Sequence, residues 1–151
     1  MKKLIAVLIV CLVPLGLVAC GDDEDKGPSK ADYIEKADAI CARSDKETDA
    51  IFEQAFEDPQ KPTPDEAQAA LDEALPVVEK DLKELEALEP PKDDKETTDA
   101  IWTAIDAGVK TLKEASADPN ASLVALTSEP FAPGDKLAGD YGMKDCGPDS
   151  N

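Results

Sequence analysis

Histidine is absent from the 151-residue chain, and aromatic residues make up only 4% of it. Without histidine, the chain lacks the most common general base, the histidine-dependent catalytic triads and the imidazole ligands of metal sites. It also has no P-loop and no GxGxxG motif. Acidic pairs such as Asp93 and Asp94 could act as acid and base in a glycosidase, but 34 acidic residues produce such pairs by chance. We therefore expect no catalytic residue, no metal site and no cofactor.

Basic residues are few as well, with 16 against 34 acidic ones and a formal charge of −18. A domain with this charge repels nucleic acid and anionic lipid headgroups, which excludes nucleic acid as a partner. Most of the acidic residues are expected on a solvated surface. The alternative is that some of them attract divalent cations or a basic partner.

Long apolar runs are confined to the N-terminus. Lys2 and Lys3 precede an apolar run from Leu4 to Val13 that is too short to span a bilayer but typical of a secretory signal. The motif that follows, Leu17-Val18-Ala19-Cys20, resembles the lipobox of bacterial lipoproteins. The resemblance implies that residues 1–19 are a cleaved signal peptide and that Cys20 carries the lipid. Cys20 would then anchor the protein to the cell membrane, outside the cytoplasm.

Cysteine is scarce, with four in the chain. Cys11 leaves with the signal peptide and Cys20 carries the lipid, so Cys41 and Cys146 remain. Disulfides persist outside the cytoplasm, and we predict a bond between these two residues. The alternative, a redox or metal-binding pair, has neither a CxxC motif nor histidine to support it.

The chain is expected to divide into four parts after export is taken into account. Residues 1–19 are the signal peptide, and residues 20–29 are the lipidated cysteine with an acidic tether that has nothing to bury. Residues 30–146 form the folded domain, and residues 147–151 a frayed tail. Processing removes two lysines and no acidic residue, which shifts the formal charge from −18 to −20.

Hydrophobic residues in the folded part recur at steps of three and four, which predicts an all-α, up-down bundle of about four helices. The first helix spans 30–57, with a buried stripe through Ile34, Ala37 and Cys41. The second begins at Thr63, whose spacing to Glu66 is that of a capping box, and is expected to kink or break at Pro76. The third spans residues 93 or 94 to 117.

The last part of the domain has a weaker pattern. Asn120 is expected to cap a short helix, and residues 129–134 form a turn rich in proline and glycine. Residues 135–141 then form one or two further turns, with Leu137 facing inward and Gly142 as the C-terminal glycine.

Three short motifs carry a second resemblance. They are Ala37-Asp38-Ala39-Ile40-Cys41, Pro90-Pro91 and Tyr141-Gly142-Met143-Lys144-Asp145-Cys146. Together they resemble small actinobacterial-type lipoproteins of unassigned function, over the whole mature chain. The resemblance implies a disulfide-stapled helical fold and brings no catalytic residues.

Two residues are candidate contacts for a ligand or partner. Trp102 is expected to pack in the core, with a ligand-stacking ring as the alternative. Pro76 is expected to be a tolerated kink, with a groove-shaping role as the alternative.

Two functions remain open. The favoured one is a non-catalytic protein-interaction or structural module of the cell envelope, which predicts no deep pocket. The other is a lipoprotein that binds a small solute or a divalent cation, which predicts a cavity near Pro76 and Trp102 or an acidic cluster.

Overall fold

The computed structural model describes residues 27–148. The predicted signal peptide, Cys20, most of the tether and residues 149–151 lie outside the described residues. The described part is helical and contains no strand. Its helices are α1 (Lys30–Ala55), α2 (Pro64–Glu86), α3 (Lys95–Ala115), α4 (Pro119–Thr127) and α5 (Ala132–Tyr141).

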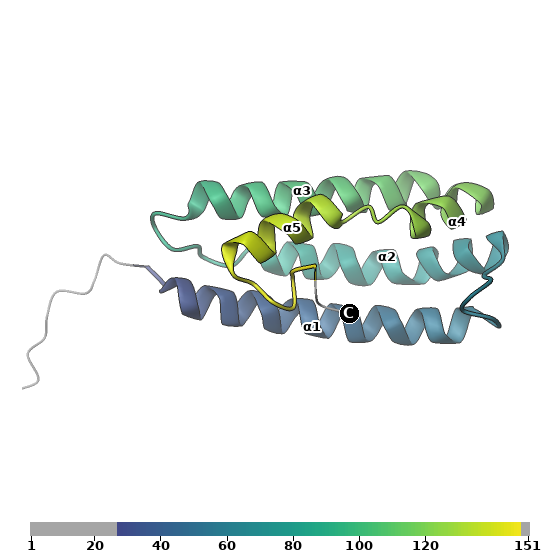
Figure 1. Cartoon of the computed structure of the whole chain (residues 1–151), viewed down its shortest axis with the longest axis horizontal. Helices are drawn as coiled ribbons and strands as arrows, with labels where there is room; N and C mark the ends of the chain where they lie inside the picture. The colour runs from purple at the N-terminus through teal and green to yellow at the C-terminus, as the bar shows by residue number, and fades with distance from the viewer. Residues whose placement is uncertain (1–26, 149–151) are drawn as a thin grey trace, which may run out of the picture.

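The first three helices are long and run up, down and up, while α4 and α5 together return along the bundle as one interrupted fourth helix (Figure 1). We call residues 119–141 the C-terminal arm. The predicted all-α, disulfide-stapled bundle of about four helices is therefore confirmed. All buried core side chains belong to residues 33–146, so the chain from residue 20 onward contains every core contact described here.

Helix ends follow local hydrogen bonding. Thr63 and Glu66 form the predicted capping box, because each side chain accepts a hydrogen bond from the other residue's backbone N–H. Gly142 ends α5 in the left-handed conformation, at φ +108°, as predicted. The prediction for Asn120 is wrong. Asp118 caps α4 by accepting the Ala121 N–H at 2.9 Å, and Pro119 takes the first helical position, where proline needs no N–H partner.

The interruption of the bundle lies in the arm and not in α2. Helix α2 continues through Pro76 without a break, with the proline exposed. Helix α4 instead ends before Pro130, and the preceding residue, Glu129, has a positive φ of 50°. A residue before proline disfavours the right-handed helical conformation, which explains the break at 128–131.

Two glycines let this broken segment lie close to α3. A Cβ atom on Gly108 would lie 2.8 Å from the carbonyl oxygen of Pro130, and one on Gly134 would lie 2.3 Å from Cδ1 of Ile105. Because of this close approach, the prediction that Leu137 faces inward is wrong. Helix α5 packs through its small face, which includes Gly134 and Ala138, so Leu137 points outward and is 38% exposed.

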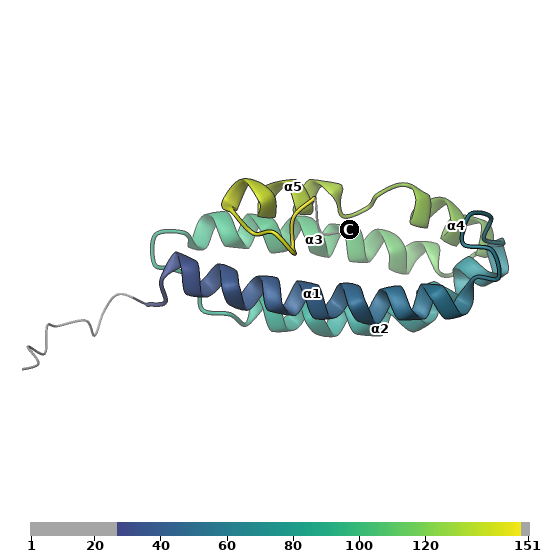
Figure 2. The same ribbon diagram turned by 60° about the horizontal axis from the view of Figure 1, so that its bottom comes forward.

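The backbone of α1 runs beside α2, and α3 and α5 lie above this pair in Figure 2. Helix α1 packs against α2, whereas α4 packs against α2 and α3, and α5 packs against α3. No Cα atom of α1 lies within 8 Å of a Cα atom of α3, α4 or α5. Side chains therefore connect α1 to the arm, and the disulfide connects α1 to the segment that follows the arm. Within the described residues, no helix is both long and apolar enough to cross a membrane.

Candidate functional site

A cavity of about 530 Å³ lies between α1 and the C-terminal arm. Its apolar floor comes from α2 and α3, and it extends along α2 from Leu71 to Leu85, or about 21 Å at the helical rise per residue. Phe52 of α1 and Phe131 of the arm line the two sides. The cavity follows from the fold, because the backbones of α1 and of the arm do not approach each other closely, and no Cα atom of α1 lies within 8 Å of a Cα atom of α4 or α5.

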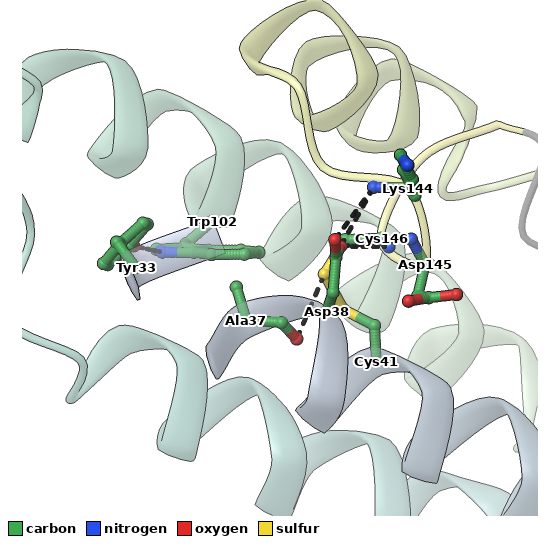
Figure 3. The surroundings of a disulfide bond; sticks show 8 residues. All are labelled: Tyr33, Ala37, Asp38, Cys41, Trp102, Lys144, Asp145 and Cys146. Atoms are coloured by element: carbon green, nitrogen blue, oxygen red, sulfur yellow. Dashed lines mark hydrogen bonds between the residues drawn. A yellow bond between two sulfur atoms is a disulfide. The ribbon is translucent and has the colours of Figure 1, made fainter. Parts of the chain in front are cut away.

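The disulfide ties the two walls of the cavity together. Cys41 of α1 and Cys146 are joined by an S–S bond of 2.04 Å, as predicted, and both residues line the cavity. Beside this bond, the Asp38 carboxylate accepts hydrogen bonds from the backbone N–H groups of Lys144, Asp145 and Cys146, at 3.0, 3.1 and 3.3 Å (Figure 3). The C-terminal segment is thus fixed to α1 by one covalent bond and one carboxylate.

The sequence analysis predicted no role for Asp38. The available signal was its spacing, because Asp38 precedes Cys41 by three residues and therefore lies on the same side of the helix. Once Cys146 is paired with Cys41, the backbone around Cys146 must come within reach of Asp38.

Replacing Asp38 with alanine should lower the free energy of unfolding by about 1–2 kcal/mol, the range for loss of a helix-cap-like carboxylate. Asp38→Asn is the matched control, since an amide oxygen can still accept N–H bonds, and it should cost less than half as much. Urea unfolding of the oxidised protein measures both. Equal losses for the two variants would show that the charge, not the acceptor oxygen, fixes the segment.

Trp102 belongs to the core and also lines the cavity. It is 5% exposed, and its Nε1–H donates to the hydroxyl of Tyr33 at 2.9 Å (Figure 3). Tyr33 in turn packs edge-to-face on Tyr141, with ring centroids 6.3 Å apart, and the Tyr141 hydroxyl donates to Asp94 at 2.7 Å. Burial raises the pKa of both tyrosines, so both stay protonated donors. Core packing of Trp102 is confirmed, and contact with a ligand stays a prediction.

Pro76 does not lie at the cavity. It is exposed on the outer side of α2, in a shallow hollow with Glu79, Lys80 and Lys83. The expectation of a cavity near both Pro76 and Trp102 is therefore wrong for Pro76. The cavity lies on the inner side of α2, because that side carries the apolar stripe.

Five acidic residues line the cavity at its more exposed positions, and we call them the rim carboxylates: Asp45, Asp49, Glu129, Asp135 and Asp145. No lysine or arginine lines the cavity. None of the five forms an ion pair within residues 27–148. The cavity therefore combines an apolar floor with a rim of uncompensated negative charge.

Burial and mutual repulsion affect the titration of two rim carboxylates. Burial raises the pKa of Asp45 to about 6, and the charges of Asp49, Asp135 and Asp145 contribute to the increase. Burial likewise raises the pKa of Asp135 to about 6. These interactions place Asp45 of α1 close to carboxylates of α5 and of the C-terminal segment. Perturbed pKa values of this kind gather at functional sites.

A sixth carboxylate, Asp81, lies deeper in the cavity wall. Its side chain is 3% exposed, and its Oδ1 accepts from Arg43 at 2.6 Å. Burial raises its pKa, but Arg43, the Ser44 hydroxyl and Lys80 outweigh this and hold the pKa below its ordinary value. Its Oδ2 is buried without a hydrogen-bond partner among the described residues. One acceptor in the cavity wall thus has unused capacity.

A preformed metal centre is not visible in residues 27–148, where no three acidic or cysteine side chains are grouped to hold an ion.

We also compared the chain with known proteins. No protein-family model, no curated protein and no solved structure matches it. The cavity is therefore the feature of residues 27–148 that bears on function.

The rim carboxylates should make the folded protein less stable as the pH rises from about 4 to about 6. Asp45 and Asp135 have folded-state pKa values near 6, above the ordinary value of 3.8, so the folded state holds more protons than the unfolded state in this range. The double variant Asp45→Asn/Asp135→Asn removes this penalty. After allowance for solvent screening, the free energy of unfolding of the double variant should exceed that of the wild type by about 1–2 kcal/mol at pH 7.

Urea unfolding between pH 3.5 and pH 8 tests this expectation. The advantage of the double variant should vanish near pH 4. Asp72→Asn/Asp93→Asn, with two exposed acids outside the cavity, controls for the change in net charge. Groups with lowered pKa values, such as Glu79 and Glu84, act at lower pH and are unchanged in every variant. An advantage that does not vary with pH would contradict the prediction.

Proposed function

We propose that this protein is a non-catalytic, lipid-anchored lipoprotein of the bacterial cell envelope that binds a small solute in the cavity between α1 and the C-terminal arm. The single observation that carries the binding function is the cavity of about 530 Å³ with its apolar floor. Its volume is in the range of about 300–1,000 Å³ that is typical of small-molecule sites. The lipobox-like sequence at residues 17–20 supports the anchor.

A protein-interaction module, favoured by the sequence, becomes the second candidate. Stable protein interfaces bury about 800 Å² on each partner. The exposed large apolar side chains in the described part are Val124 and Leu137, which are too few to form the core of such an interface. The geometry of the cavity favours a solute over a protein.

The anchor can be tested by replacing Cys20 with serine. We expect the wild-type protein to incorporate labelled fatty acid and to partition into the detergent phase, because acyl chains contribute about 0.8 kcal/mol per buried CH₂. The variant Cys20→Ser should do neither. Fatty-acid labelling that persists in the variant would contradict lipidation at Cys20.

Solute binding can be tested with N-phenyl-1-naphthylamine, a neutral apolar dye whose fluorescence rises when it leaves water. The mature chain with Cys20→Ser carries no lipid, so no detergent competes for the dye. We expect saturable binding with one site per chain. Val78→Trp places a large ring at a half-buried position of the cavity lining and should abolish binding.

Val124→Trp is the matched control, because Val124 is 66% exposed and lies outside the cavity. It should bind the dye like the parent chain. A melting curve shows whether each variant is folded, and Phe52→Ala, which enlarges the cavity, gives a second way to change binding. Absence of saturable binding to the folded parent would overturn the proposed function.

A further inference from the structure

The cavity has two chemically distinct parts, and each restricts what it can hold. Its floor offers the apolar side chains of α2 and α3, which include Leu75, Leu82 and Ile105. Its rim offers carboxylates and no cation. We propose that the solute is a small organic cation, with an apolar body on the floor and an ammonium group among the rim carboxylates. This inference rests on the proposed function and deepens it.

The apolar part of the ligand is required by the floor. Burial of apolar surface is worth roughly 25 cal/mol per Å², so a polar or fully hydrated ion would gain nothing from the lower part of the cavity. A hydrocarbon chain or a ring lying along α2 would instead contact the apolar side chains that line the cavity there, which include Leu75 and Val78. Trp102 offers part of its ring at the same surface.

The positive charge is required by the rim. Asp45 and Asp49 come from α1, Asp135 from α5, and Asp145 from the segment after α5. Carboxylates of three separate parts of the chain therefore repel one another across the mouth of the cavity. Burial raises the pKa of both Asp45 and Asp135, and for Asp45 the charges of the neighbouring carboxylates add to the increase. An ammonium group at this place would relieve the repulsion, whereas an anionic ligand would add to it.

The cavity wall adds no further uncompensated charge. Asp81 is one of its lining residues, but Arg43 compensates the charge of this side chain at 2.6 Å, and its Oδ2 is buried. A bare divalent cation fits less well, because the described residues offer no group of three ligands arranged around one point.

Three probes with the same chain length separate the two parts of the proposal: octyltrimethylammonium, octanol and octanoate. Each is titrated, far below the concentration at which it forms micelles, into the lipid-free mature chain with Cys20→Ser at pH 7.5. Displacement of the naphthylamine dye gives the dissociation constant. We expect the cation to bind at least ten times more tightly than octanol, and octanoate to bind most weakly.

Substitutions then assign the preference to the rim. Asp45→Asn/Asp135→Asn should weaken binding of the cation about tenfold and leave octanol unchanged. Asp72→Asn/Asp93→Asn changes the net charge by the same amount outside the cavity and should leave all three constants unchanged. The preference for the cation over octanol should also decline below about pH 6, because Asp45 and Asp135 take up protons there. The neighbouring carboxylates that face Asp45 are Asp49 and Asp145.

Each outcome decides a different point. Equal binding of octanol and the cation would overturn the cationic ligand and leave a neutral-solute site standing. A tenfold loss in both double variants would overturn the role of the rim and indicate a general charge effect. If none of the probes, nor the dye, binds the folded chain, then the proposed function fails together with this inference. Dye displacement by Ca²⁺ or Mg²⁺ alone would replace the organic cation with a metal ion.

Discussion

Replacing both Cys41 and Cys146 with serine should lower the free energy of unfolding by about 2–4 kcal/mol. The bond closes a loop with a sequence separation of 105 residues. The chain-entropy model gives about 4.7 kcal/mol for a loop of about 100 residues, and measured values are commonly lower. Without the bond, side chains alone would connect α1 to this part of the bundle, because no Cα atom of α1 lies within 8 Å of a Cα atom of α3, α4 or α5.

Urea unfolding of the wild-type and double-serine proteins measures this loss. The slope against urea should increase in the variant, because an unfolded chain without the cross-link exposes more surface. Wild-type protein treated with a reducing agent is the matched control and should behave like the double variant. A loss below about 0.5 kcal/mol would mean that Asp38 and the packing of Tyr33 hold α1 to the arm without the disulfide.

The helices and their ends were largely predictable, because they depend on residues close together in the chain. Proline and capping residues set the start of α2, and glycine sets the end of α5. The disulfide followed from elimination among four cysteines. The break at 128–131 was only partly visible, since Pro130 indicated a turn but the close approach to Gly108 depends on the position of another helix.

The buried face of α1 was predicted with a shift of about one residue. The sequence pattern placed Ile34 and Ala37 in the buried stripe. Ala37 is buried as predicted, whereas Ile34 is half-buried and its neighbour Tyr33 is buried instead. Tyrosine has a polar tip, and its burial depends on a partner for the hydroxyl. That partner, Trp102, is 69 positions away in sequence. Periodicity along one helix carries no information about such a pair.

The cavity was the least predictable feature. The alternative of a binding lipoprotein predicted a cavity near Pro76 and Trp102 or an acidic cluster. The cavity of the described residues is lined by Trp102 and by the five rim carboxylates but not by Pro76. The sequence could not indicate which of the 34 acidic residues would meet. Asp45 and Asp135 are 90 positions apart, and they approach each other only because the arm turns back toward α1 after its break.

Replacing Trp102 with alanine should lower the free energy of unfolding by about 3–5 kcal/mol, the range for deletion of a buried tryptophan side chain. The ring is 5% exposed and connects α3 to Tyr33 of α1 across the bundle. Its removal would also extend the existing cavity into the core and leave the hydroxyl of Tyr33 without its indole donor. The alanine variant should therefore unfold at lower urea concentration than any other single variant considered above.

Trp102→Phe separates the two contributions, because phenylalanine keeps most of the apolar volume and lacks the N–H donor. It should cost about 1–2 kcal/mol, the penalty for one unsatisfied buried polar group. Since it keeps a ring in the cavity wall, it should still bind the naphthylamine dye. If the phenylalanine and alanine variants lose equal stability, the hydrogen bond to Tyr33 is the main contribution of Trp102. If the phenylalanine variant is as stable as the wild type, Trp102 stabilises the bundle by its volume alone.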